Sequence, residues 1–169
     1  MLSESARMTT AAQARFRIDA PNSKPRAVKV IALDRQSERA IKQLSEPPWR
    51  NATFLTASSF DSALRNEAFT VSGWLSDLAG RTKNLIEEVG SADLLVMVAT
   101  AGEDAQAASI IGDACLAKRV MTTVLVLGSE AHTEEALARS LATLRPYARM
   151  LVIAKSDDYI ADMLMALRA

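Results

Sequence analysis

The apolar run from residue 92 to residue 99, Ala-Asp-Leu-Leu-Val-Met-Val-Ala, follows Gly90-Ser91. Its composition predicts a strand that is buried on both faces, in the middle of a sheet. Residues 27–33, Ala-Val-Lys-Val-Ile-Ala-Leu, form a second run of the same kind. Strands covered on both faces are typical of parallel sheets, because helical crossovers lie on the two sides. The two runs therefore indicate an α/β protein.

The segments around these runs alternate between strand and helix patterns. For example, the spacing of Ala40, Ile41 and Leu44 predicts an amphipathic helix, which Pro47-Pro48 ends. Right-handed crossovers then lead to a doubly wound, three-layer, Rossmann-like fold with six mostly parallel strands. The expected strands are 27–33, 52–57, 69–71, 92–99, 122–127 and 150–154, and the expected helical segments are 36–44, 60–65, 74–89 with a break near Gly80, 105–119, 134–144 and 158–167.

The length of 169 residues fits one domain, which we place at residues 27–169. Residues 1–26 are rich in Ala, Ser and Thr and lack the bulk to fold alone. We expect a flexible leader that packs Phe16 and Ile18 against the domain. The alternative is an arm for targeting or for docking a partner.

The charge and the cysteine count exclude several classes of function. Acidic and basic residues number 20 each, so the chain offers no basic surface for nucleic acid. Cys115 and His132 stand alone, which excludes an internal disulfide and predicts no metal site and no cofactor. No apolar run reaches the roughly 18 residues that span a bilayer. We therefore expect a cytoplasmic protein without a membrane span.

Ligands of such sheets bind beyond the carboxyl ends of the strands, where the strand order reverses. The first of these loops has no glycine, and it places Asp34 where a phosphate would bind. The central loop retains Gly102 but adds Glu103 and Asp104, which we expect to cap the following helix, with catalysis as the alternative. The candidate ligand-binding residues are Asp34, Arg35, Ser37, Thr56, Ser58, Thr100, Gly102, Glu103, Asp104, Gly128 and Ser129.

Other residues whose side chains are suited to catalysis or binding have a structural explanation. Cys115 lies mid-helix in the prediction, where a buried thiol is favoured over a nucleophile. His132 precedes a predicted helix and needs no role as a base. Trp49 and Trp74 are expected to fill gaps at the edge of the sheet. Five methionines are expected in the core, with an adaptable binding face as the alternative: Met97, Met121, Met150, Met163 and Met165.

In order and hydrophobic pattern, the segments resemble the N-terminal GTP-binding domain of FtsZ, the bacterial relative of tubulin. The resemblance covers roughly residues 27–160 and implies the strand order 3-2-1-4-5-6. Glu38 stands where the family carries an asparagine. The matching segments are 28–33 (opening strand), 37–44 (first helix), 52–57 (second strand), 63–73 (approach to the third strand), 92–99 (strand before the tubulin signature loop), 107–118, 122–127 and 144–153.

The departures from FtsZ fall on the phosphate-binding loops. Asp34-Arg35-Gln36 replaces the first glycine cluster, and residues 101–107, Ala-Gly-Glu-Asp-Ala-Gln-Ala, replace the glycine-rich signature. The closing loop is Ala154-Lys155-Ser156-Asp157 in place of Pro-Asn-Asp. The resemblance therefore implies a degenerate bacterial GTPase domain that has lost hydrolysis and tight nucleotide binding.

Two functions follow from this comparison. The first is a non-catalytic binding or regulatory module that acts through a protein partner or through self-association. The second is a protein that binds a small ligand, a nucleotide or a sugar phosphate. Residues 93–104 favour the second, because they resemble the strand and Ser-x-Ser-Gly-Glu-Thr loop of sugar-isomerase domains, although most of the hydroxyls are missing.

Overall fold

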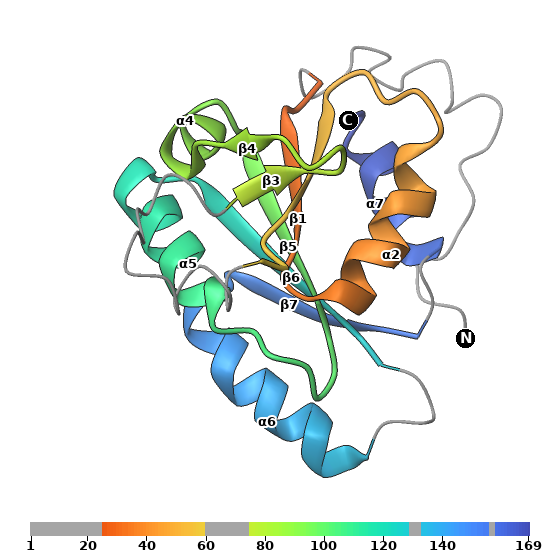
Figure 1. Ribbon diagram of the computed structural model, residues 1–169, viewed down its shortest axis with the longest axis vertical. Helices are drawn as coiled ribbons and strands as arrows, with labels where there is room; N and C mark the ends of the chain where they lie inside the picture. Colours follow the sequence, from red (N-terminus) through yellow and green to blue (C-terminus); the bar gives the residue numbers. More distant parts are fainter. Residues whose placement is uncertain (1–24, 60–74, 129–132, 156–157) are drawn as a thin grey trace, which may run out of the picture.

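The computed structural model describes residues 25–59, 75–128, 133–155 and 158–169 (Figure 1). In this part of the chain, seven strands form one sheet in the order β4-β3-β2-β1-β5-β6-β7. Parallel pairing joins five of them, β2, β1, β5, β6 and β7, and β3 is antiparallel to β2 and to β4. The predicted α/β class is confirmed. The strands are β1 (Val28–Ala32), β2 (Ala52–Thr56), β3 (Leu75–Asp77), β4 (Thr82–Lys83), β5 (Leu94–Thr100), β6 (Met121–Leu127) and β7 (Met150–Ala154).

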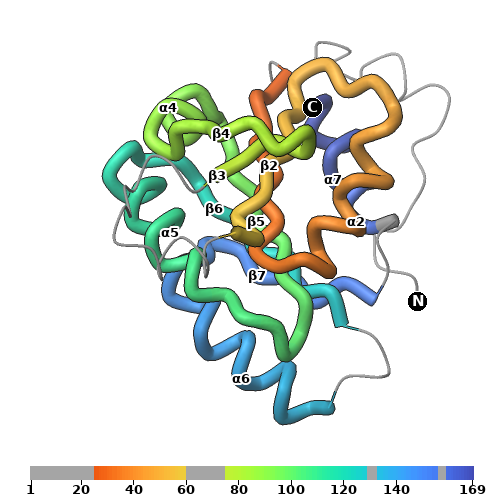
Figure 2. The backbone as a smooth tube through the Cα atoms, viewed as in Figure 1, coloured from red at the N-terminus to blue at the C-terminus, as the bar shows by residue number. Residues whose placement is uncertain are grey.

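Helices cover both faces of the sheet, as Figures 1 and 2 show. One face packs against α2 and α7, through Ile41, Ile160 and Leu164. The other face packs against α4, α5 and α6. The helices are α2 (Arg35–Ser45), α4 (Leu85–Gly90), α5 (Ala107–Lys118), α6 (Glu134–Leu144) and α7 (Asp158–Ala166), with a short 3-10 helix η2 (Arg145–Tyr147) after α6.

The central strand β5 is buried along its whole length, as its apolar sequence predicts. Leu95, Met97 and Ala99 contribute to the core under α4 and α5, whereas Leu94, Val96 and Val98 belong to the core under α2 and α7. Successive side chains of a strand point to opposite faces, so one continuous apolar run supplies both cores.

The predicted helix over residues 74–89 is wrong. Residues 75–83 form the β3–β4 hairpin, and only Leu85–Gly90 is helical. Gly80 has a φ of 81°, which suits a turn and not a helix kink. Asp77 closes this turn by accepting bonds from the amides of Ala79 and Arg81. The Arg81 amide is the main cause of the lowered pKa of Asp77.

The hairpin adds two strands to the five expected strands that lie within the described residues, which gives the seven of the sheet. β3 and β4 extend the sheet beyond β2, while the order of the other strands agrees with the expected one. The strand expected at 69–71, the helical turn at 60–65 and the leader up to residue 24 lie outside the described residues. Residues 134–144 form a helix as predicted, and the helix expected at 105–119 begins two residues later, at Ala107.

Candidate functional site

The candidate site is a crevice at the carboxyl ends of β1, β2 and β5. The chain leaves β1 toward β2 on one side, and β5 begins the opposite half of the sheet, so this is the point where the strand order reverses. The turns after β1 and β5 lie at the same end of the sheet (Figure 2). The crevice has a volume of about 170 Å³ and is lined by Leu33, Asp34, Arg35, Ala57, Ser58, Glu103, Asp104, Gln106 and Ala107.

The crevice unites five of the predicted ligand residues from three loops: Asp34, Arg35, Ser58, Glu103 and Asp104. Ser37 and Thr56 lie beside it but are buried. Their polar atoms bond to Asp34 and Glu38 respectively. Ser129 lies outside the described residues.

Asp34 occupies the N-terminus of α2, and its carboxylate bonds within the protein. Oδ1 accepts the amides of Gln36 at 2.9 Å and Ser37 at 2.7 Å. The same oxygen accepts the hydroxyl of Thr100 at 3.0 Å, and Oδ2 accepts the Thr100 amide at 2.8 Å. The side chain of Ser37 completes a capping box with the Asp34 amide. Two amides that an anion at this helix N-terminus would use are therefore engaged.

Thr100 and Gly102 do not line the crevice, and their amides bond within the protein. Thr100 is only 2% exposed and is held by Asp34. The Gly102 amide donates to Ser140 Oγ of α6 at 2.9 Å. Gly128 likewise donates its amide to the Ala154 carbonyl at 3.0 Å. These three amides therefore form hydrogen bonds that hold the loops and strand ends together at the carboxyl end of the sheet.

Glu38, one turn along α2 from Asp34, organises a second polar cluster. Its Oε2 accepts the hydroxyls of Ser58 at 2.5 Å and Thr56 at 3.1 Å, and its Oε1 lies 3.4 Å from Lys42 Nζ. Burial raises the pKa of Glu38, but the bonds from Ser58, Thr56 and Lys42 outweigh it and leave the pKa below its ordinary value. The predicted set omitted Glu38. The sequence signal was its four-residue spacing from both Asp34 and Lys42.

The expected capping role of Glu103 and Asp104 is wrong. Helix α5 begins at Ala107, its N-cap Gln106 makes no side-chain cap bond, and its first turn contains no acidic residue. Asp104 instead accepts the amide of Gln106, in the turn before the helix. Both carboxylates are exposed, because the loop after β5 continues past Gly102 before the helix starts.

The charges around the crevice are predominantly acidic. Asp34, Glu103 and Asp104 line it together with one basic residue, Arg35. Across the described parts of the chain, no group of three His, Cys, Asp or Glu side chains is arranged to hold a metal ion.

Cys115 is a core residue, as predicted. It is 1% exposed, and burial raises the pKa of its thiol to about 12, which leaves it protonated at neutral pH. His132 and Trp74 lie outside the described residues. Trp49 is half-buried and packs against Phe54, with 6.4 Å between the ring centroids.

The prediction that the five methionines belong to the core holds for Met97, and Met163 is partly buried. It is wrong for Met121, Met150 and Met165, which are 47%, 49% and 65% exposed. Met121 and Met150 are the first residues of β6 and β7, and Met165 of α7 lines a cavity that α7 forms with the C-terminal end of α2. Their apolar character had suggested burial, but strand ends and cavity walls are open to solvent.

Comparison of the chain with protein-family models and with curated proteins finds no match. Among the helices of the described ranges, none is both long and apolar enough to traverse a bilayer.

Proposed function

We propose that this domain is a non-catalytic binding or regulatory module that does not hold a nucleoside triphosphate at the crevice. The observation that carries the proposal is the bonding of Asp34, which fills the N-terminus of α2 with a carboxylate. A Rossmann-like fold that binds a nucleotide uses the amides at this position for phosphate oxygens.

Electrostatic repulsion and the volume of the crevice both disfavour a nucleoside triphosphate there. A phosphate charge 4 Å from the Asp34 carboxylate would be repelled by roughly 4 kcal/mol at an effective dielectric constant of about 20. Glu103 and Asp104 add further repulsion on the rim. The volume of about 170 Å³ is also below the roughly 300 Å³ at which pockets for drug-sized ligands begin. A nucleotide would therefore need a different loop conformation.

The resemblance to FtsZ gives this proposal an evolutionary explanation. A GTPase domain that lost its phosphate-binding glycines would keep the strands and the crevice and lose the reaction. We propose such a descent, with a cytoplasmic location and with a protein partner or self-association as the present mode of action. The position of the crevice between β1 and β5 supports this interpretation.

Thermal unfolding in the presence of GTP, GDP and ATP with Mg²⁺ tests the proposal. The wild-type protein is expected to show no change in Tm with any of them, because its helix N-terminus is occupied. Asp34→Ser, which keeps a capping hydroxyl and removes the charge, is the matched variant. A saturable rise in the wild-type Tm with GTP that is absent with ATP would restore the GTPase interpretation.

A sugar phosphate is the second candidate, favoured by the basic side chain of Arg35, which lines the crevice. A ligand of that size is closer to the available volume than a nucleotide is. If this candidate is correct, a panel of sugar phosphates will raise the Tm of the wild type, and Arg35→Ala will abolish the rise. Arg39→Ala, another arginine of α2 that does not line the crevice, is the control.

A further inference from the structure

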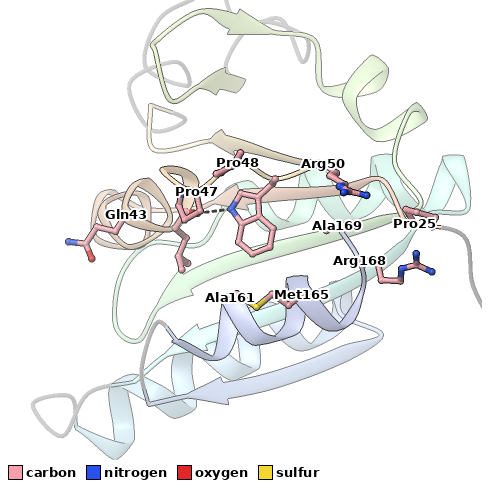
Figure 3. A pocket seen from close by; sticks show the side chains of 11 residues that line it. Pro25, Gln43, Pro47, Pro48, Arg50, Ala161, Met165, Arg168 and Ala169 are labelled. Atoms are coloured by element: carbon pink, nitrogen blue, oxygen red, sulfur yellow. Dashed lines mark hydrogen bonds between the residues drawn. The ribbon is translucent and has the colours of Figure 1, made fainter. Parts of the chain in front are cut away.

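A second cavity, of about 510 Å³, lies at the opposite end of the sheet from the crevice. It is formed by the C-terminal end of α2, the segment before β2 and the C-terminal end of α7. Figure 3 shows Pro47 and Pro48 on one side of it and Ala161 and Met165 on the other. We call this cavity the Trp49 groove; its lining residues are Pro25, Gln43, Leu44, Pro47, Pro48, Trp49, Arg50, Ala161, Met165, Arg168 and Ala169.

The centre of the Trp49 groove offers apolar contact. The indole Nε1 of Trp49 donates to the Leu44 carbonyl at 2.7 Å, so its one polar group is satisfied within the protein. Met165 presents a flexible apolar side chain that is 65% exposed. The groove therefore suits an aromatic or aliphatic side chain.

The position of Pro25 is relevant to what binds in the groove. Pro25, the first described residue, itself lines the groove, so residue 24 is bonded to the domain beside it. Residues 15–19 are Arg-Phe-Arg-Ile-Asp, in which apolar and charged residues alternate. In an extended conformation this alternation would place Phe16 and Ile18 on one side and the charges on the other.

The length of the connection is sufficient. Residues 19–24 separate Ile18 from Pro25, and an extended chain of that length spans about 20 Å. A tether this short also gives an effective concentration in the millimolar range, so modest apolar contact is enough for binding. We propose that the chain's own Phe16 and Ile18 dock in the Trp49 groove.

The test uses the full-length chain with Trp74→Phe, which leaves Trp49 as its one tryptophan. Replacing Phe16 and Ile18 by serine is expected to shift the Trp49 emission to longer wavelength. Quenching by acrylamide is expected to rise roughly twofold, because one face of the indole loses its cover. Arg15→Ser with Arg17→Ser changes the other side of the alternation and is expected to leave both signals unaltered.

A disulfide trap provides a measurement that does not depend on fluorescence. In a Cys115→Ala background, Ile18→Cys with Met165→Cys is expected to form an intramolecular bond under mild oxidation, whereas Arg17→Cys with Met165→Cys forms it more slowly. Unchanged Trp49 quenching in the Phe16/Ile18 variant, together with no trapped monomer, would overturn the proposal. The proposal would also be overturned if a roughly hundredfold dilution of the wild-type protein made Trp49 accessible to acrylamide. The group that covers Trp49 would then belong to a second copy of the chain.

Discussion

Asp34 connects two secondary-structure elements through one side chain. Its carboxylate accepts bonds from the first turn of α2 and from Thr100 at the end of β5. The side chain is 6% exposed, so water cannot replace these bonds without local opening. The residue that removes the anion site therefore also stabilises the edge of the sheet.

Asp34→Ala is expected to lower the free energy of unfolding by roughly 3 kcal/mol. It removes an N-cap and leaves the buried Thr100 amide without a partner. Urea denaturation measures the loss. Asp104→Ala is the control, because Asp104 is exposed and caps only a turn amide, and it is expected to cost less than about 1 kcal/mol. Equal effects of the two substitutions would show that the Asp34 bonds contribute little.

Glu38 predicts a specific dependence of stability on pH. Its pKa in the folded protein is below the ordinary value of 4.5, because bonds from Ser58, Thr56 and Lys42 outweigh the opposing effect of burial. The unfolded state therefore binds a proton first as the pH falls. The stabilisation by Glu38 is complete above about pH 5 and is lost as the pH falls through the folded pKa.

Urea denaturation from about pH 7 to about pH 3 tests this dependence. Glu38→Gln is expected to be less stable than the wild type at neutral pH and to lose less stability on acidification. Glu103→Gln, at an exposed carboxylate of the loop after β5, is expected to follow the wild-type curve. Parallel curves for the wild type and Glu38→Gln would contradict the assignment.

At the scale of elements, Gly112 sets the distance between α5 and η2. A Cβ atom at this position would lie 2.7 Å from both Cβ and Cδ1 of Tyr147. Tyr147 cannot move its Cβ without moving the backbone of η2. The glycine therefore has a packing role that its unfavourable helix propensity would not suggest.

Gly112→Ala is expected to destabilise the protein by about 1 to 2 kcal/mol, since the overpacking exceeds the gain of roughly 1 kcal/mol in helix propensity. Gly90→Ala in α4 is the control, because its added Cβ meets nothing within 4 Å. In a double-mutant cycle, Tyr147→Gly, which removes the Cβ as well as the ring, should remove most of the penalty at Gly112. If Gly112→Ala stabilised the protein instead, the prediction would be contradicted, because η2 would then move away from α5 at little energetic cost.

At the scale of the whole molecule, one hydrogen-bonded sheet runs without a break from β4 to β7. Its two apolar faces share the strands β1, β5 and β6, so neither core can open without exposing the other. We expect the described ranges to unfold as a single cooperative unit.

Far-UV circular dichroism and tryptophan fluorescence, followed in the same urea titration, measure this cooperativity. The two transitions are expected to coincide, with one m-value. Two separated transitions would contradict it and would point to independent melting of the β3–β4 hairpin, which joins the sheet by only two register pairs with β2.

The sequence alone determined the α/β class, the parallel central strands and the general location of the crevice. These follow from local information: β5 and β1 are apolar runs, and α6 has the boundaries that its pattern predicts. The conclusion that the first loop carries a carboxylate in place of glycines is likewise a matter of residue identity at Asp34.

Tertiary structure alone decided which of the loop residues face the crevice. Thr100 and Gly102 seemed suited to a ligand, yet Asp34 and Ser140 take their amides, and these partners lie 66 and 38 residues away in the sequence. Glu38 gained importance only when β2 brought Thr56 and Ser58 against α2. Local patterns determine strands and helices through side-chain periodicity, whereas hydrogen-bond partners across a sheet edge depend on which strands become neighbours.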